Sequence, residues 1–281
     1  MSSEYLAFLQ ASIVQVYRYG GLFTLVTGII GELFNILIFT TLKTFRRTTC
    51  GFYLTFLSIS NFGQIITAVL IRTLNYGFRI NLIGTTWTCK LRECFVHFFA
   101  LASFTLICLA TIDQFLSLVR PHWNNLYWAR WHILLIGFVW LGHNVPFLIY
   151  CDIVSNQCRN LNATFYYYVN YVIWPVFLGC LPIFIMIIFS SLAFYHVRKL
   201  NGNHRGNLFR QSQDRQLTSM TLVYVLFIVV LSTPCIIFSI YTLDLVNLTA
   251  EQSIINRLIY TILSVLYYQS YAVRFCFFAV G

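Results

Sequence analysis

Apolar residues along this chain are gathered into seven long runs separated by short polar segments. Crossing the roughly 30 Å hydrocarbon core of a bilayer takes an α-helix of about 20 residues. Lipid offers the backbone no hydrogen-bond partners, so the spanning structures are helices and closed barrels. The pattern therefore predicts an all-α membrane protein, a single seven-transmembrane domain over 1–281 with helices at about 20–42, 51–74, 95–119, 132–150, 168–194, 218–245 and 254–280.

The composition agrees with a membrane protein. Hydrophobic residues make up 59% of the chain and charged residues only 9%, and the mean hydropathy is +0.74. A soluble domain carries about 25% charged residues, so this chain cannot cover itself with a polar surface. The net charge of +10 is scattered over short loops, which favours attraction to anionic inner-leaflet lipid over nucleic-acid binding. We expect a multi-pass protein of the plasma membrane.

The loops indicate which end of each helix faces the cytoplasm. Lys and Arg are enriched in cytoplasmic loops, and the first, third and fifth loops carry more of them than the opposite side does. This predicts an N-terminus outside and a C-terminus inside. Two Asn-x-Ser/Thr glycosylation motifs, at Asn162 and Asn247, fall in loops that the same rule places outside.

A set of landmarks stands at fixed places along these runs. A cysteine opens the third run, another lies in the loop after the fourth, and the third run ends in the polar stretch 108–121. Their joint spacing resembles the rhodopsin-like G protein-coupled receptors across all seven helices, with divergent invertebrate neuropeptide-type receptors as the nearest kind. The landmarks are Trp87, Cys89, Asp113, Trp140, Cys158, Pro182 and Pro234.

This resemblance implies a function and several structural features. An extracellular ligand, a short peptide or a small molecule, would be transduced to a heterotrimeric G protein by outward movement of helix six, with Pro182 and Pro234 kinking their helices. It implies a disulfide between Cys89 and Cys158. The sequence itself predicts no cofactor and no metal site. Among the remaining external cysteines, a second bridge between Cys94 and Cys151 stays open.

The end of the third helix departs from the family pattern. The family has Asp-Arg-Tyr at the cytoplasmic face, and Asp113, Gln114 and Phe115 occupy that place. Gln114 keeps a hydrogen-bonding amide but lacks the charge of Arg. Asp214 matches the acid at the base of helix six, so its contact with Gln114 would be a hydrogen bond weaker than an ion pair. The alternative is that Asp113 merely caps a helix end near water.

The middle of the bundle departs as well. The family's first helix usually carries Gly-Asn where Gly31-Glu32 stands, and its second helix an Asp that helps to hold sodium where Asn61 stands. A buried ionised side chain is usually paired, so we expect Glu32 to pair with Arg274 of the seventh helix. The alternative is that Arg274 extends to the headgroups. The resemblance places a polar cluster here, formed by Glu32, Asn61, Ser103, Ser270 and Arg274.

The outer half of the bundle provides candidate ligand contacts. Val96 stands where amine receptors carry an Asp, and the seventh helix lacks the Lys that holds retinal in opsins. Aromatic residues and arginines suit a short peptide or an acidic small molecule, although tyrosines also gather at membrane interfaces without a ligand. The candidates are Arg72, Val96, His97, Tyr171, Tyr241, Tyr267, Tyr268 and Gln269.

Other functional classes remain beside the receptor. Gln114, together with Ser232 and Phe278 at two further switch positions, is compatible with a weakly coupling or decoy receptor of the same fold. A buried charge pair also suits a membrane transporter. A channel is the weaker alternative, because the sequence shows no pore-lining polar stripe or filter loop. The sequence holds no catalytic motif of the metalloprotease, nucleophile-elbow or phosphate-loop kind, and so does not predict an enzyme.

Overall fold

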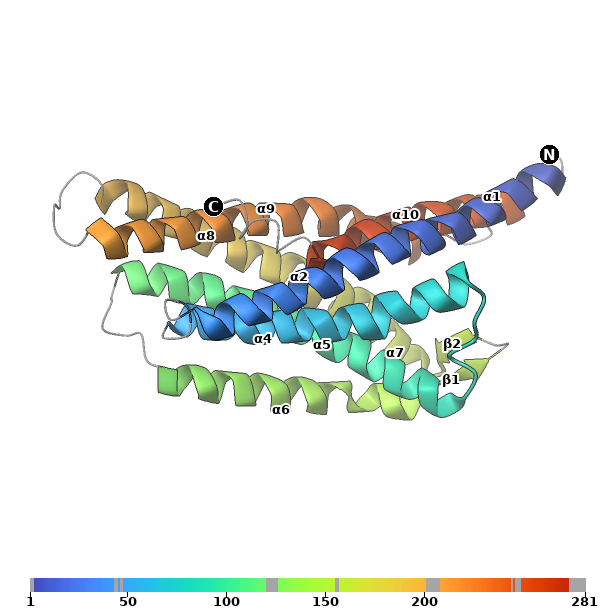
Figure 1. Ribbon diagram of the computed structural model, residues 1–281. Helices are drawn as coiled ribbons and strands as arrows, with labels where there is room; N and C mark the ends of the chain where they lie inside the picture. Colours follow the sequence, from blue (N-terminus) through green and yellow to red (C-terminus); the bar gives the residue numbers. More distant parts are fainter. Residues whose placement is uncertain are drawn as a thin grey trace.

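The structure is a computed structural model of the full chain. It describes residues 3–42, 45, 48–119, 126–154, 157–200, 208–243, 245 and 249–272, with side chains except at 3, 157, 197–200 and 208–222. The described chain is almost entirely helical, and its helices lie side by side with a small hairpin at one end (Figure 1). The prediction of an all-α membrane fold is confirmed.

Helix one combines α1, the π-helical turn η1 and α2, and helix two combines α4, η2 and η3. Helices three, four, six and seven are α5, α6, α9 and α10, and helix five combines α7, η5 and α8. The bounds are α1 Ser3–Gln15, η1 Val16–Gly20, α2 Gly21–Thr41, α4 Thr49–Gln64, η2 Ile65–Leu70, η3 Thr73–Gly77, α5 Thr86–Val119, α6 Leu126–Tyr150, β1 Cys151–Val154, β2 Gln157–Asn160, α7 Ala163–Tyr168, η5 Val169–Cys180, α8 Leu181–Leu200, α9 Leu208–Leu243 and α10 Ala250–Ala272.

The described helices include six that are long and apolar enough to cross a bilayer, and they correspond to the first six predicted runs. The seventh predicted run continues past Ala272, the end of α10, into residues outside the described part. Helix one begins at Ser3 and helix three at Thr86, well before the predicted residues 20 and 95. A helix satisfies its own backbone bonds, so it continues past the lipid through polar residues that hydropathy leaves out.

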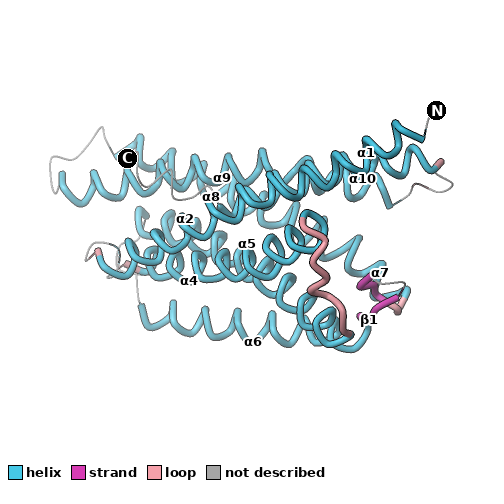
Figure 2. The backbone as a smooth tube through the Cα atoms, turned by 45° about the vertical axis from the view of Figure 1, so that its right-hand side comes forward, coloured by secondary structure: helices cyan, strands magenta, loops and turns pink. Residues whose placement is uncertain are grey.

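Helix α5 runs through the centre of the bundle (Figure 2). In the most apolar stretch of α5, 67% of the residues are buried inside the protein, whereas in that of α6 only 11% of the residues are buried. Helices α4, α6, α8 and α9 all pack against α5. The exposed aromatic and aliphatic side chains of α6 therefore form a lipid-facing surface.

The predicted kink positions lie at different places in their helices. Pro182 is the second residue of α8, two positions after the end of the π-helical segment η5, which itself contains Pro175. Pro234 lies inside α9. Each proline lacks the backbone N–H that would bond to the preceding turn. Their action as kinks remains a prediction.

Glycine allows α2 to approach its neighbours closely. A Cβ atom added at Gly28 would lie 2.6 Å from Ile65 Cδ1 and 3.1 Å from Ala272 Cβ. The same helix approaches the Thr73 side chain at Gly21. Small residues at such contacts are what lets membrane helices pack, because van der Waals contact drives their association. Helix one is therefore fixed against helices two and seven.

We expect Gly28→Leu to destabilise the protein, because a side chain inserted between Ile65 and Ala272 overpacks the contact. Overpacking costs about 1–3 kcal/mol, which would appear as a lower midpoint in thermal unfolding followed by intrinsic tryptophan fluorescence. Gly137→Leu is the matched control, since a Cβ atom there meets nothing within 4 Å. Equal midpoints for the two variants would contradict this account of the packing.

Candidate functional site

A disulfide marks one end of the bundle, which we call the disulfide face. Cys89, near the start of α5, is bonded to Cys158 of β2, with the two Cα atoms 5.6 Å apart. The pairing implied by the family resemblance is therefore present. Cys94 and Cys151 are both buried free thiols, so the second bridge considered for them is absent.

The hairpin is also joined to α5 by a carboxylate. The Thr86 hydroxyl donates to Asp152 Oδ1 at 2.8 Å, and the Ile153 backbone N–H donates to the same oxygen at 2.7 Å. These two bonds hold the pKa of Asp152 below its ordinary value of 3.8, and the bond from the backbone N–H has the larger effect. The disulfide and this carboxylate together fix the hairpin over the end of α5.

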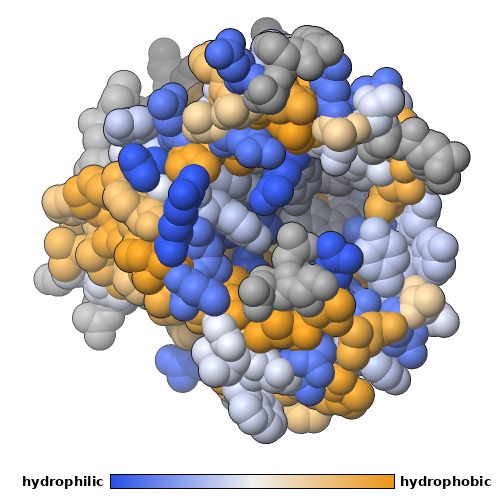
Figure 3. Space-filling model, turned by 90° about the vertical axis from the view of Figure 1, so that its right-hand side faces the viewer, coloured by the Kyte–Doolittle hydropathy of each residue, from blue (hydrophilic) through white to orange (hydrophobic). Residues whose placement is uncertain are grey.

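A polar cavity, which we call the vestibule, opens at this face. Figure 3 looks onto this end of the molecule, where hydrophilic residues surround a hollow. The cavity volume is about 620 Å³, which is within the range of small-molecule sites. It is lined by Asn75, Tyr76, Arg79, Asn81, Ile83, Arg92, Cys158 and Arg257.

The inner wall of the vestibule leads to a buried cluster on α5. Arg92 Nη1 forms an ion pair with Glu93 Oε1. His97 is one turn further along and is buried, with Nδ1 placed 2.8 Å from the Glu93 carbonyl and its ring stacked on Phe147 at 4.1 Å between centroids. The predicted candidate His97 therefore packs behind the cavity and does not line it.

A row of aromatic rings continues from this region toward the middle of the bundle. The Arg72 guanidinium lies over the Tyr268 ring at 5.3 Å, a cation–π distance. Tyr268 contacts Tyr267 at 5.3 Å between ring centroids, and the Tyr267 and Tyr271 hydroxyls are hydrogen-bonded at 2.8 Å. All three tyrosines are buried, so the row connects Arg72 with the core.

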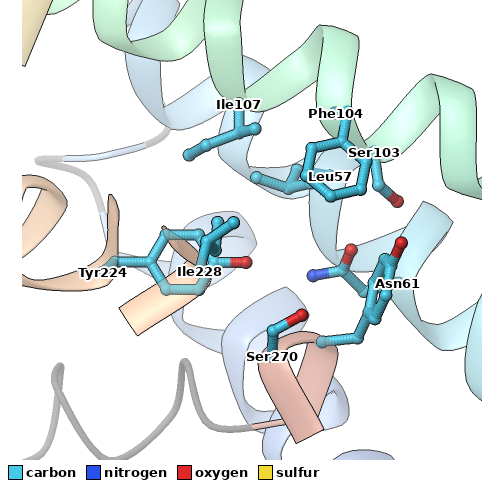
Figure 4. Close-up of a pocket in the computed structure, with 9 residues that line it drawn as sticks. Leu57, Asn61, Ser103, Phe104, Ile107, Tyr224, Ile228 and Ser270 are labelled. Carbon is cyan, nitrogen blue, oxygen red and sulfur yellow. The ribbon is translucent and has the colours of Figure 1, made fainter. Parts of the chain in front are cut away.

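The row ends at a small internal cavity, shown in Figure 4. Its volume of about 10 Å³ is close to the minimum for one water molecule. Asn61 Oδ1 and Ser103 Oγ are buried without a hydrogen-bond partner in the described part of the chain. The lining residues are Leu57, Asn61, Ser103, Phe104, Ile107, Tyr224, Ile228, Ser270 and Tyr271.

Glu32 lies beside this cavity and is fully buried. Asn61 Nδ2 donates to Glu32 Oε1 at 2.9 Å, and Asn35 Nδ2 donates to Glu32 Oε2 at 3.2 Å. The structure thus brings together four of the five residues predicted for the polar cluster, namely Glu32, Asn61, Ser103 and Ser270. Arg274 lies outside the described residues, so its pairing with Glu32 remains a prediction.

The donor set of the core cavity does not fit the sodium ion that the family resemblance suggests for this place. The polar side chains of the lining are one amide, two serines and two tyrosines, with no carboxylate among the described lining residues. Both oxygens of the nearby carboxylate, Glu32, accept amide hydrogens. Within the part of the chain that is described, no three His, Cys, Asp or Glu residues are grouped as metal ligands.

The predicted G-protein-facing residues lie near the other end of α5, which we call the Asp113 face. Helix α5 continues to Val119, so Asp113 lies within the helix and does not cap its end. Gln114 is buried, and the Phe115 ring contacts Phe189 at 5.8 Å and His196 at 5.6 Å. The side chain of Asp214 lies outside the described residues, and its contact with Gln114 remains a prediction.

The structure divides the predicted ligand contacts into separate groups. Tyr171 and Tyr241 are 41% and 60% exposed and do not line the vestibule. Val96 is packed in the core, and Gln269 is hydrogen-bonded to Thr24 of helix one at 2.8 Å. None of the predicted contacts lines the vestibule, but Arg72 is about one helical turn from Tyr76, which does, and it lies over the Tyr268 ring.

Sequence reasoning did not single out Arg79 and Arg257, two of the arginines that line the vestibule. Arg79 lies in the loop after η3, Arg92 on α5 and Arg257 on α10. The sequence does show arginines in the external segments. Because these residues are far apart in the sequence, it does not show that they line one cavity. Of the two glycosylation candidates, Asn162 caps α7 by accepting a bond from the Phe165 N–H, and Asn247 lies outside the described residues.

Comparison with known families agrees with the fold. The family model of the seven-transmembrane receptors (rhodopsin family) matches residues 33–273. The chain therefore belongs to the rhodopsin family of seven-transmembrane receptors. This is a family of receptors and not of enzymes, and it places the chain in the plasma membrane as a multi-pass protein. Receptors of this family in general have an extracellular ligand and a G protein as partners. No curated protein matches the sequence closely enough to count as a relative.

The hydrogen bonds of Glu32 generate a prediction about the core. Glu32→Gln places an amide nitrogen against an amide donor, which costs about 1–3 kcal/mol for the unsatisfied buried group. Asn61→Asp places a second carboxylate against Glu32, and two buried carboxylates in contact cannot both ionise. Each single variant should therefore lower the thermal midpoint.

The double variant Glu32→Gln with Asn61→Asp exchanges donor and acceptor across the 2.9 Å contact. We expect it to be more stable than the sum of the single effects, with a coupling above about 0.5 kcal/mol. Thermal unfolding of all four proteins forms the cycle. Additive losses would show that the contact between Glu32 and Asn61 does not stabilise the bundle.

The lowered pKa of Asp152 predicts an acid-dependent stability of the disulfide face. Because the folded pKa is below the unfolded one, the contribution is fully present above the unfolded pKa and is lost as the pH falls through the folded pKa. Thr86→Val removes one of the two hydrogen bonds and should weaken this pH dependence. The thermal midpoint measured from about pH 7 to pH 3 tests the difference, and identical pH profiles would contradict it.

Proposed function

We propose that this receptor binds its extracellular ligand in the vestibule and transmits the signal to a heterotrimeric G protein at the Asp113 face. Helix six, α9, would move outward at that face, as the family resemblance implies. This assignment also places the disulfide face outside the cell. The ligand would be a short peptide or a small molecule, since the vestibule of about 620 Å³ accommodates either.

The observation that carries the proposal is a continuous row of contacts from the vestibule to helix six. Tyr76 lines the vestibule about one turn from Arg72 on helix two. Arg72 rests on Tyr268, and the tyrosines below it lead to Tyr271 at the core cavity. There Tyr271 shares the lining with Tyr224 and Ile228 of α9.

This row gives a physical route for the signal. A ligand that draws the Arg72 guanidinium away from the Tyr268 ring would change the packing of the tyrosines beneath it. Packed interiors respond to such shifts by moving between discrete arrangements. Tyr224 and Ile228 are buried side chains of α9 at the end of the row, so a rearrangement there acts on helix six.

A second candidate is a receptor that binds its ligand but couples weakly. The family's Arg at the end of helix three is replaced by Gln114, which is buried and lacks the charge. The family's aromatic residue near the helix-six proline is replaced by Ser232, whose hydroxyl donates to the Ile228 carbonyl at 2.5 Å. A serine bonded within its own helix makes no bulky contact with its neighbours.

The two candidates differ in the expected behaviour of Gln114→Arg. Restoring the charge should increase G protein dissociation in cells that carry equal amounts of receptor at the surface, by about tenfold if one charge-assisted hydrogen bond is gained. Gln114→Met, similar in size and uncharged, is the control and should not exceed the wild type. The assay is run with and without a library of short amidated peptides.

Ligand-dependent dissociation from the wild type would support a working receptor in which the missing Arg is tolerated. Signal from Gln114→Arg alone would support the weakly coupling receptor. Silence of all three proteins at full surface expression, across several G protein types, would contradict the proposed coupling.

A further inference from the structure

We propose that the vestibule recognises a multiply anionic ligand, one that presents at least two carboxylate or phosphate groups to Arg79, Arg92 and Arg257. This inference rests on the proposed function, because it names the chemical class of ligand for the same receptor.

Three guanidinium groups from distant parts of the chain meet in one cavity. They come from the loop after helix two, from helix three and from helix seven. Among the described residues, no acidic side chain lines the cavity, and the one ion pair formed by the three arginines is that of Arg92 with Glu93. Arg79 and Arg257 form no ion pair in the described structure. Like charges in a shared cavity repel one another, and an anion between them relieves this repulsion.

The neutral polar side chains of the lining add donors. The Asn75 side-chain oxygen accepts the Leu82 N–H at 2.8 Å, and the Asn81 side-chain oxygen accepts the Ile83 N–H at 3.2 Å. With their oxygens engaged, the two amides offer nitrogen donors. Arginine also offers donors only. Except for the Tyr76 hydroxyl, the polar side chains of the lining therefore favour a ligand that accepts hydrogen bonds.

Two features indicate that the arginines are held in place for binding. Arg79 has a φ of 59°, the one positive φ among the described non-glycine residues, and such backbone strain concentrates at ligand sites. Arg92 is 10% exposed at its side chain, and its Nε is buried without a hydrogen-bond partner in the described part of the chain. A buried unsatisfied donor gains most from an incoming acceptor.

The geometry of the guanidinium group narrows the ligand class. Its planar set of donors matches the two oxygens of a carboxylate or phosphate. Arg92 is already paired with Glu93, but Arg79 and Arg257 together still carry more charge than a single carboxylate can neutralise, so we infer a ligand with at least two negative groups. A short peptide rich in Asp or Glu and a small polyphosphate both meet this requirement.

The test measures binding directly, without a G protein. The full-length receptor is placed in nanodiscs of neutral phosphatidylcholine, and anisotropy is recorded for a fluorescent Glu-Glu-Glu peptide. Its Gln-Gln-Gln counterpart, ATP and inorganic phosphate serve as competitors. We expect the acidic peptide to bind, the glutamine peptide to fail as a competitor, and affinity to fall as salt is raised.

The matched variants separate the site from bulk charge. Arg79→Gln and Arg257→Gln should each weaken binding by about tenfold or more, as expected for a lost charge-assisted hydrogen bond. Arg159→Gln removes the same charge from β2 at the same face, outside the lining, and should change affinity by less than about twofold. Thermal unfolding confirms that each variant is folded.

The competitors identify the source of the negative groups. Stronger competition by ATP than by unlabelled acidic peptide would support the site with phosphate as the recognised group, and the reverse order would support it with carboxylate. Binding by inorganic phosphate alone, an adventitious ion only, would overturn the proposal. The proposal would also be overturned if the glutamine peptide bound as tightly as the acidic peptide. An equal loss of affinity in the Arg79, Arg257 and Arg159 variants would overturn it as well.

The outcome is separable from that of the proposed function. Anion binding at the vestibule without any G protein dissociation would contradict the coupling and leave the site intact. Signalling by an uncharged ligand, unaffected by Arg79→Gln and Arg257→Gln, would overturn the anion site and leave the receptor function intact.

Discussion

The carboxylate of Glu32 is held in the middle of the bundle by two amide donors, and much of the structure depends on that arrangement. The lipid around the bundle offers no hydrogen-bond partners, so a polar group buried at this depth must find them inside the protein. The bond from Asn61 joins helix one to helix two. The close approach at Gly28 brings the same two helices together with helix seven. These contacts fix one wall of the core cavity that helix six also lines.

Helix three organises the two functional ends. At the disulfide face it carries Cys89 and Thr86, which hold the hairpin in place, and Arg92, which lines the vestibule. At the other end it carries Asp113 and Gln114. Because the helix is buried along its length against most of the others, a change of packing at one end is transmitted to a neighbouring helix more readily than to solvent. The tyrosine row from Arg72 to Tyr271 runs beside it.

The fold could be predicted from the sequence because the bilayer imposes a simple rule on length and polarity. The seven apolar runs and the proline positions could be read from the sequence, and the resemblance to the receptor family implied the disulfide pairing. The helix ends were less accurate, since a helix such as that starting at Thr86 continues into water without any apolar signal. Four members of the polar cluster were also predicted, because polar residues in apolar runs are few and conspicuous. Tyr171 and Tyr241 were named as ligand contacts by their position near the outer end, but helical rotation places both on the exposed surface.

The sequence by itself therefore determined that the protein lies in a lipid bilayer, to which class it belongs and which residues must be buried. These properties follow from the polarity of short stretches of the chain and from the resemblance to the receptor family. Only the tertiary structure decided which external arginines share a cavity. Arg79, Arg92 and Arg257 are separated by many residues and look alike in sequence, as does Arg159. Their convergence depends on the relative positions of helices two, three and seven and of the loop after helix two, and packing across the bundle, not local pattern, sets those positions.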